Sequence, residues 1–337
     1  MTLAQHHFIE RRSGRVVPEQ LFGDRIVSFL YNDMRESAPA MFRLFTSSQM
    51  SSLLASVNYD LPFVRLFTSQ RQFLQSCGIR LDECLDAASV LDTPRKVFER
   101  KIRYWECRPM PEDPLAIVSP ADARVIIGSF QIDSRIEVKN KFFAYEELLG
   151  QERADLHAAF QGGDFAVFRL TPDKYHYNHL PVAGVVREIY DIDGTFHSCN
   201  PTAIVAAVTP YSKNRRVVTI IDTDVPNGTG IGKVAMIEVV ALMIGEIVQC
   251  YSDRAYDQPQ PLLPGMFVHK GSPKSLYRPG SSTDILVFQA GRVTFDADLL
   301  ENLKRVDVKS RFTSGFRMPL VETDVQVRSQ IGRRSKP

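Results

Sequence analysis

The chain has 337 residues, of which 44% are apolar, so it is long enough for one large domain or two modest ones with a sizeable core. Its 41 Lys and Arg nearly balance its 39 Asp and Glu, and a net charge of +2 does not favour nucleic acid as a partner. Five widely spaced cysteines without a Cys-x-x-Cys pair argue against a disulfide framework and a zinc site. We therefore expect a globular protein of a reducing compartment with no metal at its site.

The N-terminus lacks the apolar segment of a signal peptide, so we expect no export. The most apolar later run, residues 234–248, contains Glu238 and Glu246 and is too short to cross a bilayer. The sequence therefore predicts a soluble or membrane-surface protein.

The first third of the chain, residues 1–108, is predicted to be helical. Apolar residues at helical spacing follow Pro18, recur in residues 41–54 and again in residues 63–73, and the last segment should stop near Gly78. Such stripes usually pack into a core. Arginines lie among these phenylalanines, however, so the alternative is a surface that rests on lipid headgroups.

From about residue 109, short β-branched runs alternate with clusters of Gly, Pro, Asp and Asn, which is typical of a β-rich unit. The predicted fold class is therefore α+β, with a helical N-terminal region followed by a mostly antiparallel β-rich domain over residues 109–325. Residues 326–337 are basic and end in proline, and we expect a flexible tail. The expected strands include residues 124–127, 165–170, 185–190, 217–221, 234–240 and 285–288.

Three short segments carry reactive groups. Residues 119–125 (Ser-Pro-Ala-Asp-Ala-Arg-Val) supply a carboxylate, residues 171–181 (Thr-Pro-Asp-Lys-Tyr-His-Tyr-Asn-His-Leu-Pro) supply two histidines, and residues 279–283 (Pro-Gly-Ser-Ser-Thr) supply serines. A carboxylate, a base and a serine are the parts of an activated-serine system. Taken singly, each part is more often structural: a turn aspartate, packed histidines and a flexible turn.

Together and in this order, the segments resemble motifs of the phosphatidylserine decarboxylase family, whose members are pyruvoyl enzymes made as one inactive chain. The usual forms in the family are S-P-x-D-G-x-[IV], Y-H-x-x-H-x-P, and L-G-S-T or G-G-S-T before an apolar strand. Residues 95–109 are similar to the start of the family's catalytic domain, and residues 270–280 to its glycine-containing hairpin. Residues 8–60 are similar to the leader of a bacterial branch, so the resemblance covers most of the chain.

The resemblance implies a reaction and a covalent cofactor. An amino acid loses carbon dioxide readily only if the remaining electrons have a sink, which side chains do not offer and a pyruvoyl ketone does. The substrate amine would form a Schiff base with that ketone before the carboxylate leaves. The implied enzyme is a phosphatidylserine decarboxylase, a carboxy-lyase of phospholipid biosynthesis that yields phosphatidylethanolamine.

The resemblance also implies roles for particular residues. In the family a serine attacks the carbonyl of the preceding residue, the ester is eliminated with cleavage of the chain, and the dehydroalanine left behind becomes pyruvoyl. By resemblance His179 is the base, Asp122 orients it, and Ser281 or Ser282 is the nucleophile. His176 resembles a second histidine implicated in protonating the product carbanion, with a packing role as the alternative.

The chain departs from the family pattern in residues 280–283 (Gly-Ser-Ser-Thr), which contain an extra small residue. The spacing from Ser282 to the glycine of the following turn matches the family, whereas counting forward from Lys270 selects Ser281. The first count is the more constrained, because strand register fixes which side chains face inward. We therefore predict cleavage of the Ser281–Ser282 bond and a C-terminal chain of residues 282–337, with Gly280–Ser281 as the alternative cut.

Two other departures lie near these motifs. Ala123 stands where the family usually has glycine after the acid, which leaves the turn at Asp122 open. Residues 199–201 (Cys-Asn-Pro) resemble a Ser-Val-Asn-Pro loop near the substrate carboxylate in the family, and the nearby His197 is additional and has no assigned role.

The predicted partners are phosphatidylserine and the membrane surface, with the protein peripheral on the cytoplasmic face of the cell membrane. We expect the cleaved large and small chains to stay associated, and the assembly to be a homodimer. The alternative enzyme is a soluble pyruvoyl-dependent decarboxylase of a free amino acid, with the helical third as a lid or dimer surface. A scaffold that never cleaves is disfavoured by the intact set of acid, histidine and serine.

Overall fold

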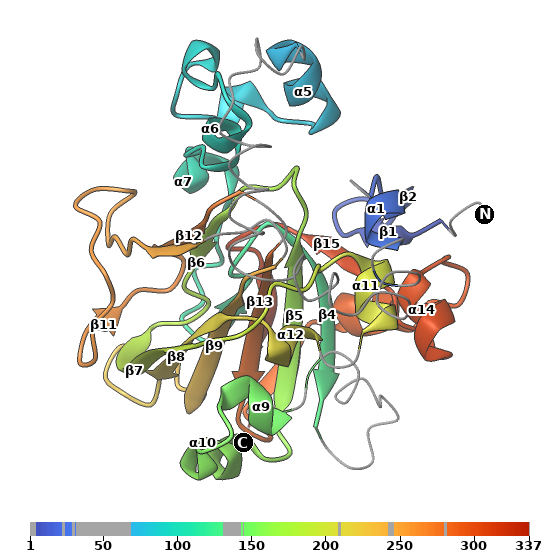
Figure 1. The fold of residues 1–337 in the computed structure, drawn as a ribbon. Helices are drawn as coiled ribbons and strands as arrows, with labels where there is room; N and C mark the ends of the chain where they lie inside the picture. Colours follow the sequence, from blue (N-terminus) through green and yellow to red (C-terminus); the bar gives the residue numbers. More distant parts are fainter. Residues whose placement is uncertain are drawn as a thin grey trace.

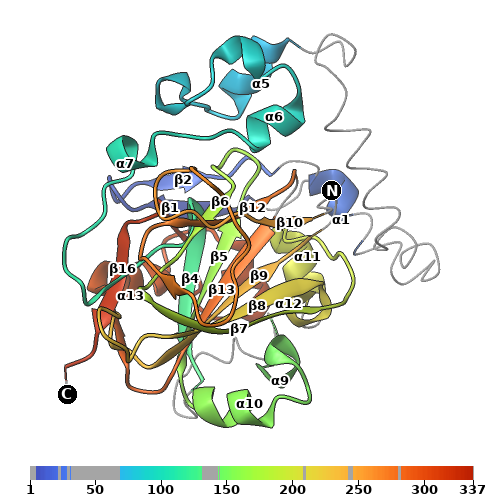
Figure 2. The ribbon, with the colours of Figure 1, turned by 90° about the vertical axis from the view of Figure 1, so that its left-hand side faces the viewer.

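The computed structural model shows a large β-sheet with a small helical unit at one end (Figure 1, Figure 2). That unit contains α5 (Gln70–Ser76), α6 (Pro94–Phe98) and α7 (Tyr104–Cys107). No helix among the described residues is long and apolar enough to span a membrane. The structure describes residues 5–21, 24–28, 31, 69–130, 143, 145–207, 210–241, 246–279 and 282–336.

Within the described residues the large sheet has ten strands in the order β11-β7-β8-β9-β13-β5-β4-β15-β1-β2. Neighbouring strands are antiparallel, except that β1 runs parallel to β15. In the order of the sheet, the bounds are β11 (Phe267–Val268), β7 (Gly184–Ile192), β8 (Arg216–Asp222), β9 (Lys233–Val239), β13 (Ser282–Phe288), β5 (Asp164–Leu170), β4 (Ala123–Ser129), β15 (Thr323–Val325), β1 (His7–Glu10) and β2 (Val16–Pro18).

Strand β13 lies in the middle of this sheet, and all its residues are buried. Residues 285–288 of this strand are apolar, as expected for a strand covered on both faces, whereas its first three residues are polar and nevertheless buried. The pairing register places Ser282 opposite Leu170 of β5 and Asp284 opposite Glu238 of β9. The start of this strand is therefore fixed from both sides.

Two three-stranded sheets, β10-β12-β6 and β14-β16-β3, complete the β structure of the described residues. In both ribbon views β6 and β12 lie between the α5–α7 unit and the large sheet (Figure 1, Figure 2). The bounds are β10 (Ile247–Gln249), β12 (Pro273–Tyr277), β6 (Tyr177–His179), β14 (Val293–Phe295), β16 (Gln330–Arg334) and β3 (Ala116–Val118).

Short helices connect and flank the strands. Thr93 caps α6 by accepting a hydrogen bond from the Lys96 amide, and Asn200 caps α11 (Pro201–Ala206) by accepting one from the Thr202 amide. Both helices have proline in the first turn, where its missing N–H is not needed. The other helices in the part of the chain that the structure describes are α1 (Asp24–Ser28), η3 (Leu81–Glu83), η4 (Ala88–Val90), α9 (Tyr145–Leu149), α10 (Ala154–Phe160), α12 (Pro210–Lys213), α13 (Ala297–Leu303) and α14 (Arg311–Phe316).

The α+β class and the mostly antiparallel sheet are confirmed, and each expected strand overlaps an observed one. The prediction of a helical N-terminal region is wrong where the chain begins, because β1 and β2 form a hairpin there. Pro18 ends β2, and the helix expected after it is present as the short α1 (Asp24–Ser28). The expected helix before Gly78 is present as α5, whereas residues 41–54 and 63–67 lie outside the described residues.

The prediction of a flexible tail over residues 326–337 is also wrong. Residues 330–334 form β16, which pairs with β3 on one side and β14 on the other. Backbone pairing satisfies the peptide groups of this basic segment and holds it in place. The β-rich domain therefore extends beyond residue 325.

Candidate active site

Ser282 is the first residue of β13, and its side chain is completely buried. Its hydroxyl oxygen Oγ has no hydrogen-bond partner among the described residues. A buried hydroxyl without a partner has a desolvation cost and needs a functional explanation. The alternative nucleophile Ser281 and its neighbour Gly280 lie outside the described residues.

His179, the last residue of β6, is fully buried and held at both ring nitrogens. Nδ1 lies 2.8 Å from the Gly271 carbonyl oxygen, and Nε2 lies 3.0 Å from the Tyr175 hydroxyl. Because a carbonyl only accepts, Nδ1 carries the proton and Nε2 accepts from Tyr175. Burial lowers the pKa of His179 to about 3, so the ring is neutral at pH 7 with Nε2 as its basic atom.

Tyrosines surround His179. The Tyr175 hydroxyl lies 2.7 Å from the hydroxyl of Tyr256, which lies 3.0 Å from the Ile102 carbonyl oxygen. Tyr104 of α7 packs edge-on against the imidazole, with ring centroids 4.7 Å apart. Sequence reasoning assigned no role to these tyrosines, although Tyr175 lies within the histidine motif.

Asp122 is buried and bound by Arg108, which was noted in the sequence only as part of a motif. Arg108 Nε and Nη2 donate to the two carboxylate oxygens at 3.0 and 2.7 Å, and the Val327 amide donates at 2.8 Å. Burial opposes ionisation, but the Arg108 charge outweighs it and keeps the pKa of Asp122 below its ordinary value. Asp122 is therefore a carboxylate at neutral pH.

The expected contact in which Asp122 orients His179 is not among the hydrogen bonds of the described residues. Both nitrogens of His179 are bonded elsewhere, and the Asp122 oxygens face Arg108 and Val327. The His179 backbone amide donates to the Pro120 carbonyl at 2.7 Å, so the two motifs are adjacent. The negative charge of Asp122 acts on the ring through space and favours its protonated form.

His176 is buried on the loop before β6. Its Nδ1 lies 2.8 Å from the Lys174 carbonyl oxygen, and its ring centroid lies 4.5 Å from that of Phe98 in α6. The Tyr277 amide donates to the His176 carbonyl, and the Tyr277 hydroxyl contacts the Thr283 carbonyl. Strand β12 thus links the histidine loop to the residue after Ser282.

The two other departures from the motifs also have a place in the structure. Ala123 has no left-handed backbone conformation, so its position does not require glycine. The Thr283 hydroxyl lies 3.1 Å from Cys199 Sγ, and burial raises the pKa of this thiol to about 12. His197 Nδ1 lies 3.2 Å from the Tyr31 hydroxyl. Residues 199–201 therefore reach the strand that carries Ser282.

A cavity of about 380 Å³ is lined in part by Asp122 and Tyr175, and its lining does not include Ser282 or His179. Its wall is strongly polar. Most of its cationic side chains form ion pairs with carboxylates, such as Arg108 with Asp122 and Lys174 with Asp324. The other lining residues include Arg11, Arg12, Gly78, Arg80, Glu83, Arg100, Asp173 and Ser329.

Ser282, His179 and Asp122 are all buried, and they supply the residue types of an activated-serine system, although no hydrogen bond among the described residues joins the three side chains. Comparison with known proteins gives a consistent result: the family model described as phosphatidylserine decarboxylase matches residues 95–313. The chain belongs to the phosphatidylserine decarboxylase family.

Several relatives carry the name phosphatidylserine decarboxylase proenzyme. One from Chlamydia trachomatis is 28% identical over 294 residues, which cover 87% of this chain and 90% of the relative. One from Chlamydia muridarum is 31% identical over 233 residues, which cover 69% of this chain and 71% of the relative. A proenzyme 2 from Oryza sativa subsp. japonica is 32% identical over 253 residues, covering 73% of this chain and 36% of that longer protein.

Proposed function

We propose that this chain is a phosphatidylserine decarboxylase proenzyme that cuts itself before Ser282 and then forms phosphatidylethanolamine. The observation that carries the proposal is the Ser282 hydroxyl, buried and without a hydrogen-bond partner among the described residues. A serine that is to be converted into a pyruvoyl group fits that place, since no contact of its hydroxyl has to be broken. Membership of the family supplies the reaction.

In the proposed cut, Ser282 Oγ attacks the Ser281 carbonyl carbon, the carbon–nitrogen bond breaks, and the freed nitrogen of residue 282 takes a proton. A base then removes the Cα proton of residue 282, the Cβ–Oγ bond breaks, and Ser281 leaves as a carboxylate. Water then hydrolyses the dehydroalanine: its nitrogen leaves as ammonia, and the pyruvoyl group remains at position 282. His179 Nε2 is the proposed base. Its hydrogen bond from the Tyr175 hydroxyl has to break before Nε2 can take a proton.

The pyruvoyl group at position 282 supplies an electron sink for the pair that carbon dioxide leaves behind. Around it the chain excludes water, since Ser282, His176 and His179 are all buried. His176 is the proposed donor of a proton to the product carbon, and Asp122 favours a positive charge on His179 through space. Thr283 and Cys199 fix the neighbouring backbone.

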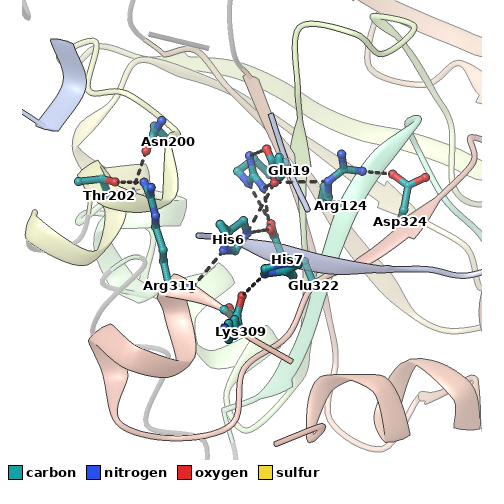
Figure 3. A network of polar contacts seen from close by, with 12 residues as sticks. His6, His7, Glu19, Arg124, Asn200, Thr202, Lys309, Arg311, Glu322 and Asp324 are labelled. Atoms are coloured by element: carbon teal, nitrogen blue, oxygen red, sulfur yellow. Dashed lines mark hydrogen bonds and ion pairs between the residues drawn. The ribbon is translucent and has the colours of Figure 1, made fainter. Parts of the chain in front are cut away.

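We also propose that the two cleaved chains stay associated. The C-terminal chain would contain β13, which lies between β9 and β5, and β15, which lies between β1 and β4. Glu322 of that chain is buried against the large chain: its carboxylate is 2.8 Å from His6 Nε2 (Figure 3) and 2.6 Å from Arg169 Nη2. Arg124 pairs with Asp324 beside them. Dissociation would expose these buried charges and the strand edges.

The same cluster has metal-ligand geometry in His6, Glu19 and Glu322. Arg169 Nη2, however, lies 2.6 Å from a carboxylate oxygen of both glutamates, so a guanidinium already provides the positive charge there. The cluster is better explained as a link between chains than as a metal site.

A lipid surface is the proposed location of the substrate. Four large apolar side chains of residues 81–105 are between 42% and 48% exposed: Leu81, Leu85, Val90 and Trp105. This segment includes α6 and α7, which lie at one end of the molecule (Figure 1) and contact His176 and His179. Exposed apolar side chains of this kind suit the interfacial layer of a bilayer.

The test is turnover by fully cleaved protein. Vesicles containing phosphatidylserine should yield carbon dioxide and phosphatidylethanolamine, whereas free serine and tryptophan should not react. Decarboxylation of a free amino acid without turnover of vesicles would overturn the lipid assignment and favour the soluble alternative. Peripheral binding at the cytoplasmic face and the homodimer remain predictions.

A further inference from the structure

A buried polar cluster lies beside Ser282 and takes no part in the proposed chemistry. Its central residues are Asp284, Tyr277, Glu238 and Lys274, and the side chain of each is completely buried. Asp284 follows Ser282 by two residues on β13, and alternate residues of a strand point to the same face. Asp284 and Ser282 therefore share one side of the sheet.

The Tyr277 hydroxyl connects this acid to the backbone. It lies 2.7 Å from Asp284 Oδ1 and 3.0 Å from the Thr283 carbonyl oxygen. The carbonyl can only accept, and the phenol has one proton to donate. Both contacts are satisfied if Asp284 is protonated on Oδ1: the acid donates to Tyr277, and Tyr277 donates to Thr283.

The surroundings favour a neutral Asp284. Opposite it on β9, Glu238 lies 2.5 Å from Lys274 Nζ and also accepts from Asn178, Gln249 and Ser275. Burial opposes its ionisation, but Lys274 outweighs this and lowers the pKa of Glu238. Burial, and then the Glu238 charge, raise the pKa of Asp284 well above its ordinary value. The environment therefore favours a charged Glu238 and a neutral Asp284, because the Lys274 ammonium is bound to Glu238.

We propose that Asp284, as a neutral acid, and Tyr277 are positioning residues for the chain cut, and that they select Ser282 over Ser281 by holding the Thr283 carbonyl. This inference rests on the proposed self-cleavage. The hydrogen bonds of Asp284 and Tyr277, which we call the relay, join residue 277 to residue 283, and the proposed cut lies between these two positions in the sequence. Slippage of β13 by one residue would turn Asp284 to the opposite face and break both contacts.

The experiment follows the cut by intact mass during cell-free synthesis of the full chain, with samples quenched over time. Tyr277→Phe removes only the hydroxyl, and we expect it to slow the cut about tenfold, in line with the loss of one buried hydrogen bond. Asp284→Leu should do the same. Asp284→Asn should stay within about twofold of wild type, because an amide still donates to Tyr277.

Tyr251→Phe is the matched control, since Tyr251 is another buried tyrosine whose hydroxyl bonds a nearby aspartate, Asp253. It should cut at the wild-type rate. The relay is refuted if Tyr277→Phe cuts as fast as wild type and only before Ser282, or if Asp284→Asn is as slow as Asp284→Leu. Failure of the wild-type chain to cut would instead remove the proposed function, so the two failures are distinguishable.

Discussion

Arg108 is the residue on which the charge of the site depends most directly. It donates to both oxygens of Asp122 and lies 3.0 Å from a Glu83 oxygen, and all three side chains are buried. Arg108→Met keeps the apolar stem and removes the guanidinium. Asp122 then loses its ion-pair partner, whereas Glu83 retains the exposed Arg80.

Removing one partner of a buried ion pair costs about 3–5 kcal/mol, because the remaining charge is left without compensation. The cost should depend on pH. In the wild type the pKa of Asp122 is depressed, so its stabilising effect is present above the unfolded pKa of about 3.9 and disappears as the pH falls through the folded pKa. In Arg108→Met that pKa rises, so the variant should recover stability relative to wild type on acidification.

The assay is urea unfolding at pH 7 and pH 5, with both proteins carrying Ser282→Ala so that the chain remains whole. Arg187→Met is the control: Arg187 pairs with Asp222 at 2.7 Å but is 50% exposed, and such a pair contributes about 1 kcal/mol or less. A loss at Arg108 no larger than at Arg187, or one that does not shrink at pH 5, would refute the reasoning.

Three further predictions follow from the contacts. Tyr175→Phe should slow the cut about tenfold, because it removes the hydrogen bond to His179 Nε2, whereas Tyr190→Phe, remote from the site, should not; equal rates in a mass time course would contradict this. Glu322→Gln should release the small chain of cleaved protein at lower urea than wild type by size exclusion, with exposed Glu301→Gln as the control, since Arg169 and His6 lose their buried carboxylate. Trp105→Ser should reduce sedimentation with phosphatidylserine vesicles severalfold without changing the cut, and unchanged sedimentation would exclude Trp105 from the membrane surface.

The strands of the large sheet could be predicted because burial on both faces leaves apolar runs in the sequence, as in residues 285–288. The N-terminal hairpin could not, because β1 and β2 are only four and three residues long and β1 depends on β15, more than 300 residues away. The prediction for the C-terminal tail was wrong for the same reason. The residues of β16 are basic and lie at the end of the chain, and their strand structure depends on pairing with β3, which is distant in the sequence.

The site could be predicted in its residue types and not in its contacts. The motifs supply Asp122, His179 and Ser282, but the partner that orients the imidazole is a carbonyl 92 residues away, at Gly271. A backbone oxygen leaves no trace in the residue type. The pairing of Asp122 with Arg108 was likewise hidden, since both residues were known only as members of separate motifs.

The central claim is that Ser282 is the residue consumed in the cut. Intact-mass measurement of wild type, Ser282→Ala and Ser281→Ala tests it most directly. Wild type and Ser281→Ala should give two chains, the smaller covering residues 282–337 with a pyruvoyl mass at its N-terminus, and Ser282→Ala should stay whole. A wild-type chain that remains whole after folding, or a Ser282→Ala chain that is still cut, would contradict the account.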